Sequence, residues 1–106
     1  MLNEISVSEL KRRLDQQEDL QLVDVRKEAE FAHCNLGGEL IPLGDLPRQI
    51  SRIAQDRTVV VICHHGFRSA QAIHFLQQRH GYTHLLNLKG GIHAWATTID
   101  PTMPVY

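Results

Sequence analysis

Runs of apolar residues at several places along the chain have the length and composition of β-strands. The clearest is Thr58–Ile62, which is almost entirely β-branched and does not alternate with polar residues. Such a pattern is typical of a strand buried on both faces, at the centre of a parallel sheet. Residues 20–25 and Leu85–Leu88 form similar runs, and a short strand is predicted at 40–42, where Pro42 ends it.

Helical periodicity occurs between these strands. The first such segment opens with a capping box, in which Ser6 and Glu9 can each satisfy the other's backbone N–H. A helix that ends before Gln17 is predicted from the apolar stripe Val7, Leu10 and Leu14. A short helix is predicted at 27–32. A second amphipathic helix is predicted from the stripe Leu46, Ile50 and Ile53. A longer helix at 69–80 has the inward stripe Ala72, Ile73 and Leu76.

The alternation of strands and helices, with short connections, predicts an α/β sandwich with a mostly parallel central sheet flanked by helices. A length of 106 residues fits one domain, 1–106, and an apolar fraction of 42% is enough for one core. The formal net charge of -1 disfavours a nucleic-acid binder. Because the chain has no apolar run of roughly 18 residues and no signal-peptide pattern, we expect a cytoplasmic protein that does not bind membranes.

The residues with a candidate chemical role come directly after the central strand. There the chain reads Cys-His-His-Gly-Phe-Arg-Ser, residues 63–69, and then enters a helix. This places Cys63 at the carboxyl end of the strand, where open α/β sheets bind ligands. A loop that closes onto a helix N-terminus directs backbone N–H groups towards an anion. Gly66 permits a conformation that a side chain resists, and Arg68 adds positive charge. These features favour a nucleophilic thiolate over a merely structural Cys63.

In this loop the chain resembles the rhodanese family, whose active loop is Cys-x-x-Gly-x-Arg-Ser. The matching residues are Cys63, Gly66, Arg68 and Ser69. Three further segments are similar to family signatures, namely 22–26 followed by Glu30 and Phe31, 41–43, and 88–92 followed by Ala94 and Trp95. The resemblance covers essentially the whole chain and implies a rhodanese-like three-layer sandwich. The tail, 99–106, is similar to the rhodanese domains that end certain sulfur-carrier adenylyltransferases.

The resemblance implies an enzyme, a sulfurtransferase of the thiosulfate:cyanide type that carries sulfane sulfur as a persulfide on Cys63. Cys63 would attack a small anionic donor such as thiosulfate, and Arg68 would hold the departing sulfite. The terminal sulfur would be bound by the backbone N–H groups of His64, His65, Gly66, Phe67 and Ser69. The acceptor would be a thiol or a protein. No cofactor is expected, and nothing in the sequence demands more than a monomer.

Two other functions are weighed against this one. A non-catalytic rhodanese-like binding module is disfavoured because Cys63 and Arg68 are both present. A phosphatase or arsenate reductase would use the same cysteine loop. The loop in those related enzymes is one residue longer and forms a wider cradle for a tetrahedral oxyanion, so the shorter loop here favours sulfur.

The histidines around the loop have no obvious role. Because His64 and His65 are adjacent, we expect one of them to face solvent, and either could help to recruit anions or merely occupy a tolerant loop position. Together with Phe67 they form the predicted outward face of the loop, which would select the acceptor. The other histidines are His33, His74, His80, His84 and His93. Their spacings match no zinc pattern, so no metal site is predicted.

Cys34 has two interpretations: a buried structural thiol, or a resolving cysteine that accepts sulfur from Cys63 or forms a disulfide with it. Asp24 and Arg26, with Glu30, are interpreted as structural support beneath the active loop, and Asp24 could also orient that loop. Residues 90–91 predict a tight turn before a helix whose Trp95 packs in the core.

Overall fold

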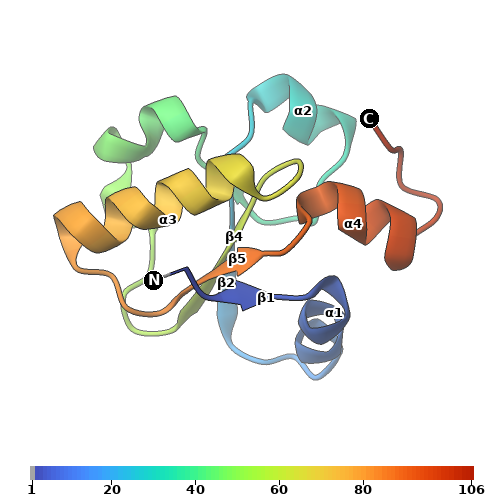
Figure 1. Cartoon of the computed structure of the whole chain (residues 1–106), viewed down its shortest axis with the longest axis horizontal. Helices are drawn as coiled ribbons and strands as arrows, with labels where there is room; N and C mark the ends of the chain where they lie inside the picture. The colour runs from blue at the N-terminus through green and yellow to red at the C-terminus, as the bar shows by residue number, and fades with distance from the viewer. Residues whose placement is uncertain (1) are drawn as a thin grey trace.

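The computed structural model describes residues 2–106, which form three layers around one parallel sheet (Figure 1). The sheet has the order β1-β5-β4-β2-β3, and every neighbouring pair in it is parallel. The strands are β1 Glu4–Ile5, β2 Leu20–Asp24, β3 Glu39–Leu40, β4 Thr58–Ile62 and β5 Leu85–Leu88. The predicted α/β class is therefore confirmed.

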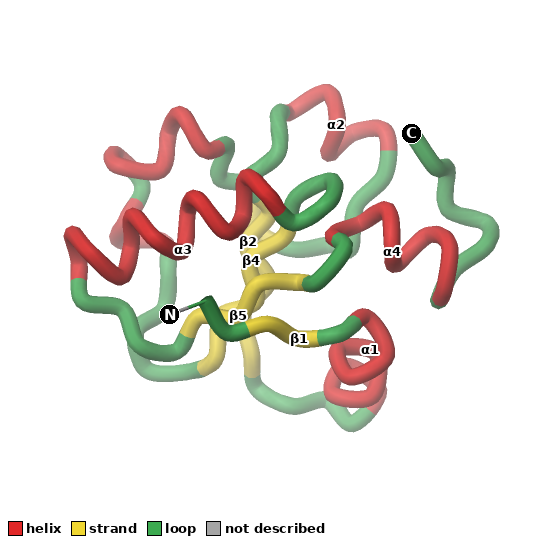
Figure 2. Tube along the Cα trace, viewed as in Figure 1, coloured by secondary structure: helices red, strands yellow, loops and turns green. Residues whose placement is uncertain are grey.

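Helices cover both faces of the sheet (Figure 2). One face packs against α1 and α4, and the other against α3 and two short 3₁₀ segments. The helices are α1 Val7–Asp15, α2 Glu28–His33, α3 Phe67–His80 and α4 Gly91–Thr98, and the 3₁₀ segments are η1 Leu43–Arg48 and η2 Ile50–Arg52. Within residues 2–106, none of the helices has the length and apolar character needed to cross a membrane.

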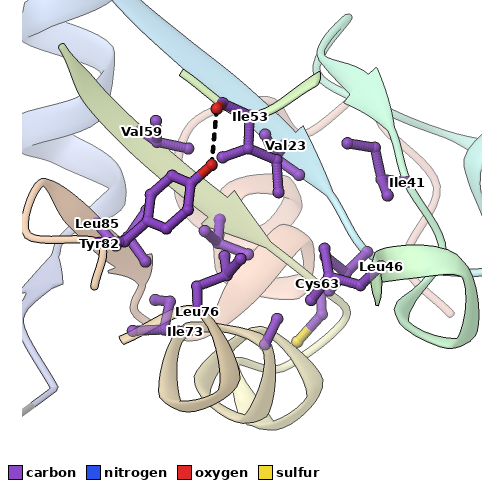
Figure 3. Packing of buried hydrophobic residues seen from close by; sticks show 13 residues of the cluster. Val23, Ile41, Leu46, Ile53, Val59, Cys63, Ile73, Leu76, Tyr82 and Leu85 are labelled. Carbon is purple, nitrogen blue, oxygen red and sulfur yellow. Dashed lines mark hydrogen bonds between the residues drawn. The ribbon is translucent and has the colours of Figure 1, made fainter. Parts of the chain in front are cut away.

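Strand β4 contributes to a separate hydrophobic cluster on each face of the sheet. Val59 and Val61 pack with α3 in one cluster, part of which is drawn in Figure 3, while Val60 and Ile62 pack in the other with α1 and α4. All four side chains are essentially buried. This double burial explains why the strand reads as a continuous apolar run, and it holds the residue after Ile62 firmly at the edge of the core.

Three local features differ from the sequence-based predictions. Strand β1 has only two residues, Glu4–Ile5, and was not predicted. The predicted amphipathic helix through Leu46 is wrong, because Pro47 has no N–H to donate to the carbonyl four residues earlier, and the chain forms η1 and η2 instead. The N–H of Glu9 does bond to Ser6 Oγ, at 3.1 Å, but the Glu9 carboxylate bonds to arginines of α1 rather than completing the capping box.

Candidate active site

Cys63 is buried at the carboxyl end of β4, with 1% of its surface exposed. The chain turns sharply at Gly66, whose φ of 105° lies in the region that favours glycine, and α3 begins at the next residue. This turn brings the backbone N–H of Gly66 back to the sulfur, where it donates a hydrogen bond to Cys63 Sγ at 3.0 Å. The loop therefore supplies one fixed donor to the sulfur from its own backbone.

Ser69, in the first turn of α3, supplies the second polar contact of the sulfur. Its hydroxyl lies 3.2 Å from Cys63 Sγ and donates to Oδ1 of Asn87, on the adjacent strand β5. Either atom can be the donor in the contact between sulfur and hydroxyl, so the hydroxyl is able to donate to a thiolate. The Asn87 amide donates in turn to the Gly66 carbonyl at 3.2 Å and to Glu4 at 3.1 Å. Asn87 thus ties the loop to the sheet.

Arg68 points to Glu30 of α2 and forms a two-pronged ion pair with it, at 2.6 and 2.9 Å. The hydrogen bonds from Arg68 are the main reason that the pKa of Glu30 falls to about 2, and Glu30 raises the pKa of Arg68 in return. The same carboxylate accepts from the Lys27 N–H and from the Tyr106 hydroxyl. Glu30 therefore fixes where the guanidinium of the loop lies.

Asp24 and Arg26 form a buried ion pair at the end of β2, with the guanidinium fully shielded from solvent. Burial opposes the charge of Arg26, but its hydrogen bonds to Asp24 and Tyr106 outweigh that effect and raise its pKa. Arg26 also donates to the Cys34 carbonyl at 2.6 Å and to the Tyr106 hydroxyl at 2.7 Å. The pair thus joins β2 to the segment after α2 and to the tail.

The side chains of the loop lie at different depths. Phe67 is 82% exposed, His65 is exposed and His64 is half-buried. The His64 ring stacks on Tyr106, with 3.8 Å between the ring centroids and 2° between the planes. Burial, and then the neighbouring His65, lower the pKa of His64. His93, from α4, lies beside both loop histidines.

Cys34 lies apart from the loop, in the hydrophobic cluster on the α1 and α4 face, whereas Cys63 belongs to the cluster on the α3 face. Both cysteines are free thiols. The sulfur of Cys34 has a weak contact with the Pro104 carbonyl at 3.8 Å. The two thiols are thus neither bonded nor packed in one cluster.

Sequence reasoning did not identify Asn87 or Tyr106 as part of this site. Asn87 carried a usable signal, because it is a polar residue inside an otherwise apolar strand, Leu85–Leu88. Tyr106 carried none, since its contacts with Arg26 and Glu30 depend on the path of the tail from α4 back to the loop, which is drawn in red in Figure 1.

Comparisons with known proteins give relatives for the chain as a whole. A family model described as a rhodanese-like domain matches residues 6–98. A sulfurtransferase of Allochromatium vinosum is 45% identical over 97 residues, which cover 91% of this chain and 90% of that protein. The "Probable adenylyltransferase/sulfurtransferase MoeZ" of Mycobacterium tuberculosis is 36% identical over 96% of this chain, which spans only 26% of MoeZ.

A crystal structure of a rhodanese-like domain protein from Staphylococcus aureus is similar along its whole length, with a TM-score of 0.82, 28% identity and 99% of each chain covered. The family match and the relative from Allochromatium support a sulfurtransferase function and an enzymatic role. The match also extends over nearly all of the described fold. This chain belongs to the rhodanese-like family.

Proposed function

We propose that this protein transfers sulfane sulfur from a small anionic donor, such as thiosulfate, to a thiophilic acceptor through a persulfide on Cys63. The observation that carries the proposal is the setting of the Cys63 sulfur, which receives the Gly66 N–H at 3.0 Å and lies beside the Ser69 hydroxyl. Donors fixed around a sulfur stabilise negative charge there, and the thiolate is the reactive form.

In the first step, the Cys63 thiolate attacks the outer sulfur of thiosulfate. A sulfur–sulfur bond forms to Cys63, the original sulfur–sulfur bond breaks, and sulfite leaves with the bonding electrons. In the second step, an acceptor such as cyanide or a thiolate attacks the terminal sulfur. The Cys63 thiolate leaves, so the enzyme returns to its starting state and no external oxidant is needed.

Arg68 is the proposed group that holds the anionic donor, with the loop N–H groups around the terminal sulfur. Two observations support this role: Arg68, whose guanidinium is always charged, lies in the first turn of α3, one residue before Ser69, and its ion pair with Glu30 fixes where that guanidinium lies. The exposed Phe67 is the proposed contact for an acceptor protein. We expect the reaction to take place in the cytoplasm, where thiol acceptors are abundant.

The test is intact-protein mass spectrometry after incubation with thiosulfate, for the wild type, Cys63→Ser and the matched control Cys34→Ser. We expect the mass to increase by one sulfur atom in the wild type and in Cys34→Ser, with reversal by cyanide, and no increase in Cys63→Ser. A wild type that gains no sulfur from any persulfide or thiosulfate donor, but hydrolyses an aryl phosphate, would overturn the proposal in favour of a phosphatase.

A further inference from the structure

Three histidines meet at one end of the sheet, beside the loop. His64 and His65 follow Cys63 directly, and His93 lies in the first turn of α4. One ring nitrogen from each lies within 4.8 Å of the other two. The ring centroids of His64 and His65 are 3.9 Å apart, and those of His65 and His93 are 4.9 Å apart. We refer to these three residues as the histidine cluster.

The backbone holds the histidine cluster together. The N–H of His93 donates to the His64 carbonyl at 3.0 Å, and the N–H of Ile92 donates to the Cys63 carbonyl at 2.9 Å. This close approach depends on Gly91, where an added Cβ would lie only 2.4 Å from the His64 carbonyl oxygen. The α4 terminus is therefore docked on the loop, and the proximity of the three rings follows from the main chain rather than from flexible side chains.

Two ring nitrogens of the cluster, His64 Nε2 and His93 Nδ1, are buried and have no hydrogen-bond partner among residues 2–106. Buried polar atoms normally have partners, because leaving one unpaired is energetically unfavourable. Neutral imidazole nitrogens are also the commonest protein ligands of divalent transition metals. The unpaired nitrogens thus belong to the same two residues that the backbone holds side by side.

We propose that the histidine cluster binds a divalent transition-metal ion of the zinc class, with His64, His65 and His93 as ligands and a fourth position left open. Three imidazoles with an open position are a known ligand set for Zn²⁺. Nitrogens bound to one tetrahedral ion lie roughly 3.4 Å apart, so the cluster must tighten, and the exposed His65 ring is free to move. This proposal differs from the sequence-based prediction, in which the spacings of the histidines indicated no metal site.

The inference does not rest on the proposed sulfur transfer, so it is tested with the thiols removed. Untagged Cys34→Ser/Cys63→Ser protein serves as the parent, because cysteines would otherwise bind zinc themselves. Isothermal titration with Zn²⁺ at neutral pH should show one ion bound per chain. The parent should also bind Co²⁺ and develop its visible absorption bands.

His65→Gln and His93→Gln in the parent should each weaken binding by about tenfold or more, because each removes one of the three ligands. The matched control is His74→Gln, an exposed histidine in the middle of α3, which should bind as the parent does. Thermal melts without metal check that the variants are folded. His65 is exposed, so its replacement keeps the test valid even if His93→Gln unfolds.

Absence of zinc binding by the folded parent would overturn the inference. So would unchanged affinity in folded His65→Gln, or an equal loss of affinity in the His74→Gln control.

Discussion

The two cysteines of this protein are buried to similar degrees but occupy opposite kinds of surroundings. Cys63 is 1% exposed and Cys34 8% exposed. Around the Cys63 sulfur lie a backbone N–H at 3.0 Å and a serine hydroxyl at 3.2 Å. Among the residues that the structure describes, the polar contact of the Cys34 sulfur is a carbonyl at 3.8 Å, and it is the backbone carbonyl of Cys34, not its sulfur, that binds the buried Arg26.

Burial alone therefore does not distinguish a reactive thiol from a structural one. Donors aimed at sulfur stabilise a thiolate, whereas a carbonyl near sulfur accepts only a thiol proton. The contacts around Cys63 support the thiolate of the proposed function, whereas the contacts around Cys34 fix the backbone after α2. Substitutions in the two regions should accordingly show how much each region contributes to stability and to sulfur loading.

The largest effect is expected on the Cys34 side of the comparison, from Arg26→Met. This change leaves Asp24 as a buried charge without its partner, and we expect the free energy of unfolding to fall by about 3–5 kcal/mol. Urea denaturation measures the change. Arg79→Met, an exposed arginine of α3, is the control and should lie near the wild type. A loss below about 1 kcal/mol in Arg26→Met would show that the pair does not hold this region together.

The next effect is expected on the Cys63 side, from Gly91→Ala. The new methyl group would lie 2.4–2.5 Å from the carbonyl oxygens of His64 and Cys63, at a residue with φ of 62°. Strain and overpacking together should cost about 2–4 kcal/mol, and the loop should shift with α4. Thermal melts test the stability. Gly44→Ala, where an added Cβ meets no atom of residues 2–106 within 4 Å, should melt near the wild type.

A smaller effect, on rate, is expected for Ser69→Ala. Without the hydroxyl, Cys63 Sγ keeps only the Gly66 donor, and Asn87 Oδ1 loses its partner. We expect sulfur loading from thiosulfate to slow by about tenfold, equivalent to about 1.4 kcal/mol. Thiocyanate production in the presence of cyanide gives the rate, with the exposed Ser51→Ala as control. An unchanged rate would mean that the hydroxyl only fills space.

The smallest effect is expected for Glu30→Gln, and it depends on pH. The folded-state pKa of Glu30, about 2, lies below the ordinary value of 4.5, so its stabilisation is complete above pH 4.5 and disappears as the pH falls through 2. Because the pair with Arg68 is partly exposed, we expect only about 1 kcal/mol at pH 7.

Urea denaturation of Glu30→Gln and the wild type, at pH 7 and at successively lower pH, gives this difference directly. The two proteins should converge as the solution becomes more acid. Glu28→Gln, an exposed neighbour on α2, should show no such convergence. A gap between Glu30→Gln and the wild type that widens on acidification would contradict the assignment.

The conformation of the cysteine loop could be predicted from the sequence because its information is local. The central strand, Cys63, Gly66 and Arg68 lie within a few positions, and their spacing already implies a strand, a turn and a helix start. The alternation of strands and helices could also be predicted, because each strand or helix shows its pattern within a short stretch of sequence. In contrast, β1 was missed because two residues cannot display a periodicity. The helix predicted through Leu46 was wrong because Pro47 prevents an α-helix there, although the apolar spacing is helical.

The surroundings of the loop could be predicted only in part: Glu30 was expected beneath it, and Asn87 left a signal as a polar residue in an apolar strand, but the pairings themselves join distant segments. Glu30, Asn87 and Tyr106 reach it only after the sheet order and the path of the tail are set. The nearness of His93 to His64 likewise depends on a backbone approach that only Gly91 permits. The spacing of His64, His65 and His93 in the sequence does not indicate this contact, so a search for zinc-ligand motifs does not find the histidine cluster.

Strand β1 pairs with β5, which joins residues 83 positions apart through the contact of Glu4 with the Asn87 amide. Contacts between such distant segments form late in folding, because a long loop must close before they give any stabilisation. That same amide orients Ser69 and Gly66 around the sulfur. A nascent chain that has already made β4 and α3 therefore has its cysteine but not its completed site, and sulfur loading should appear only with the last step of folding.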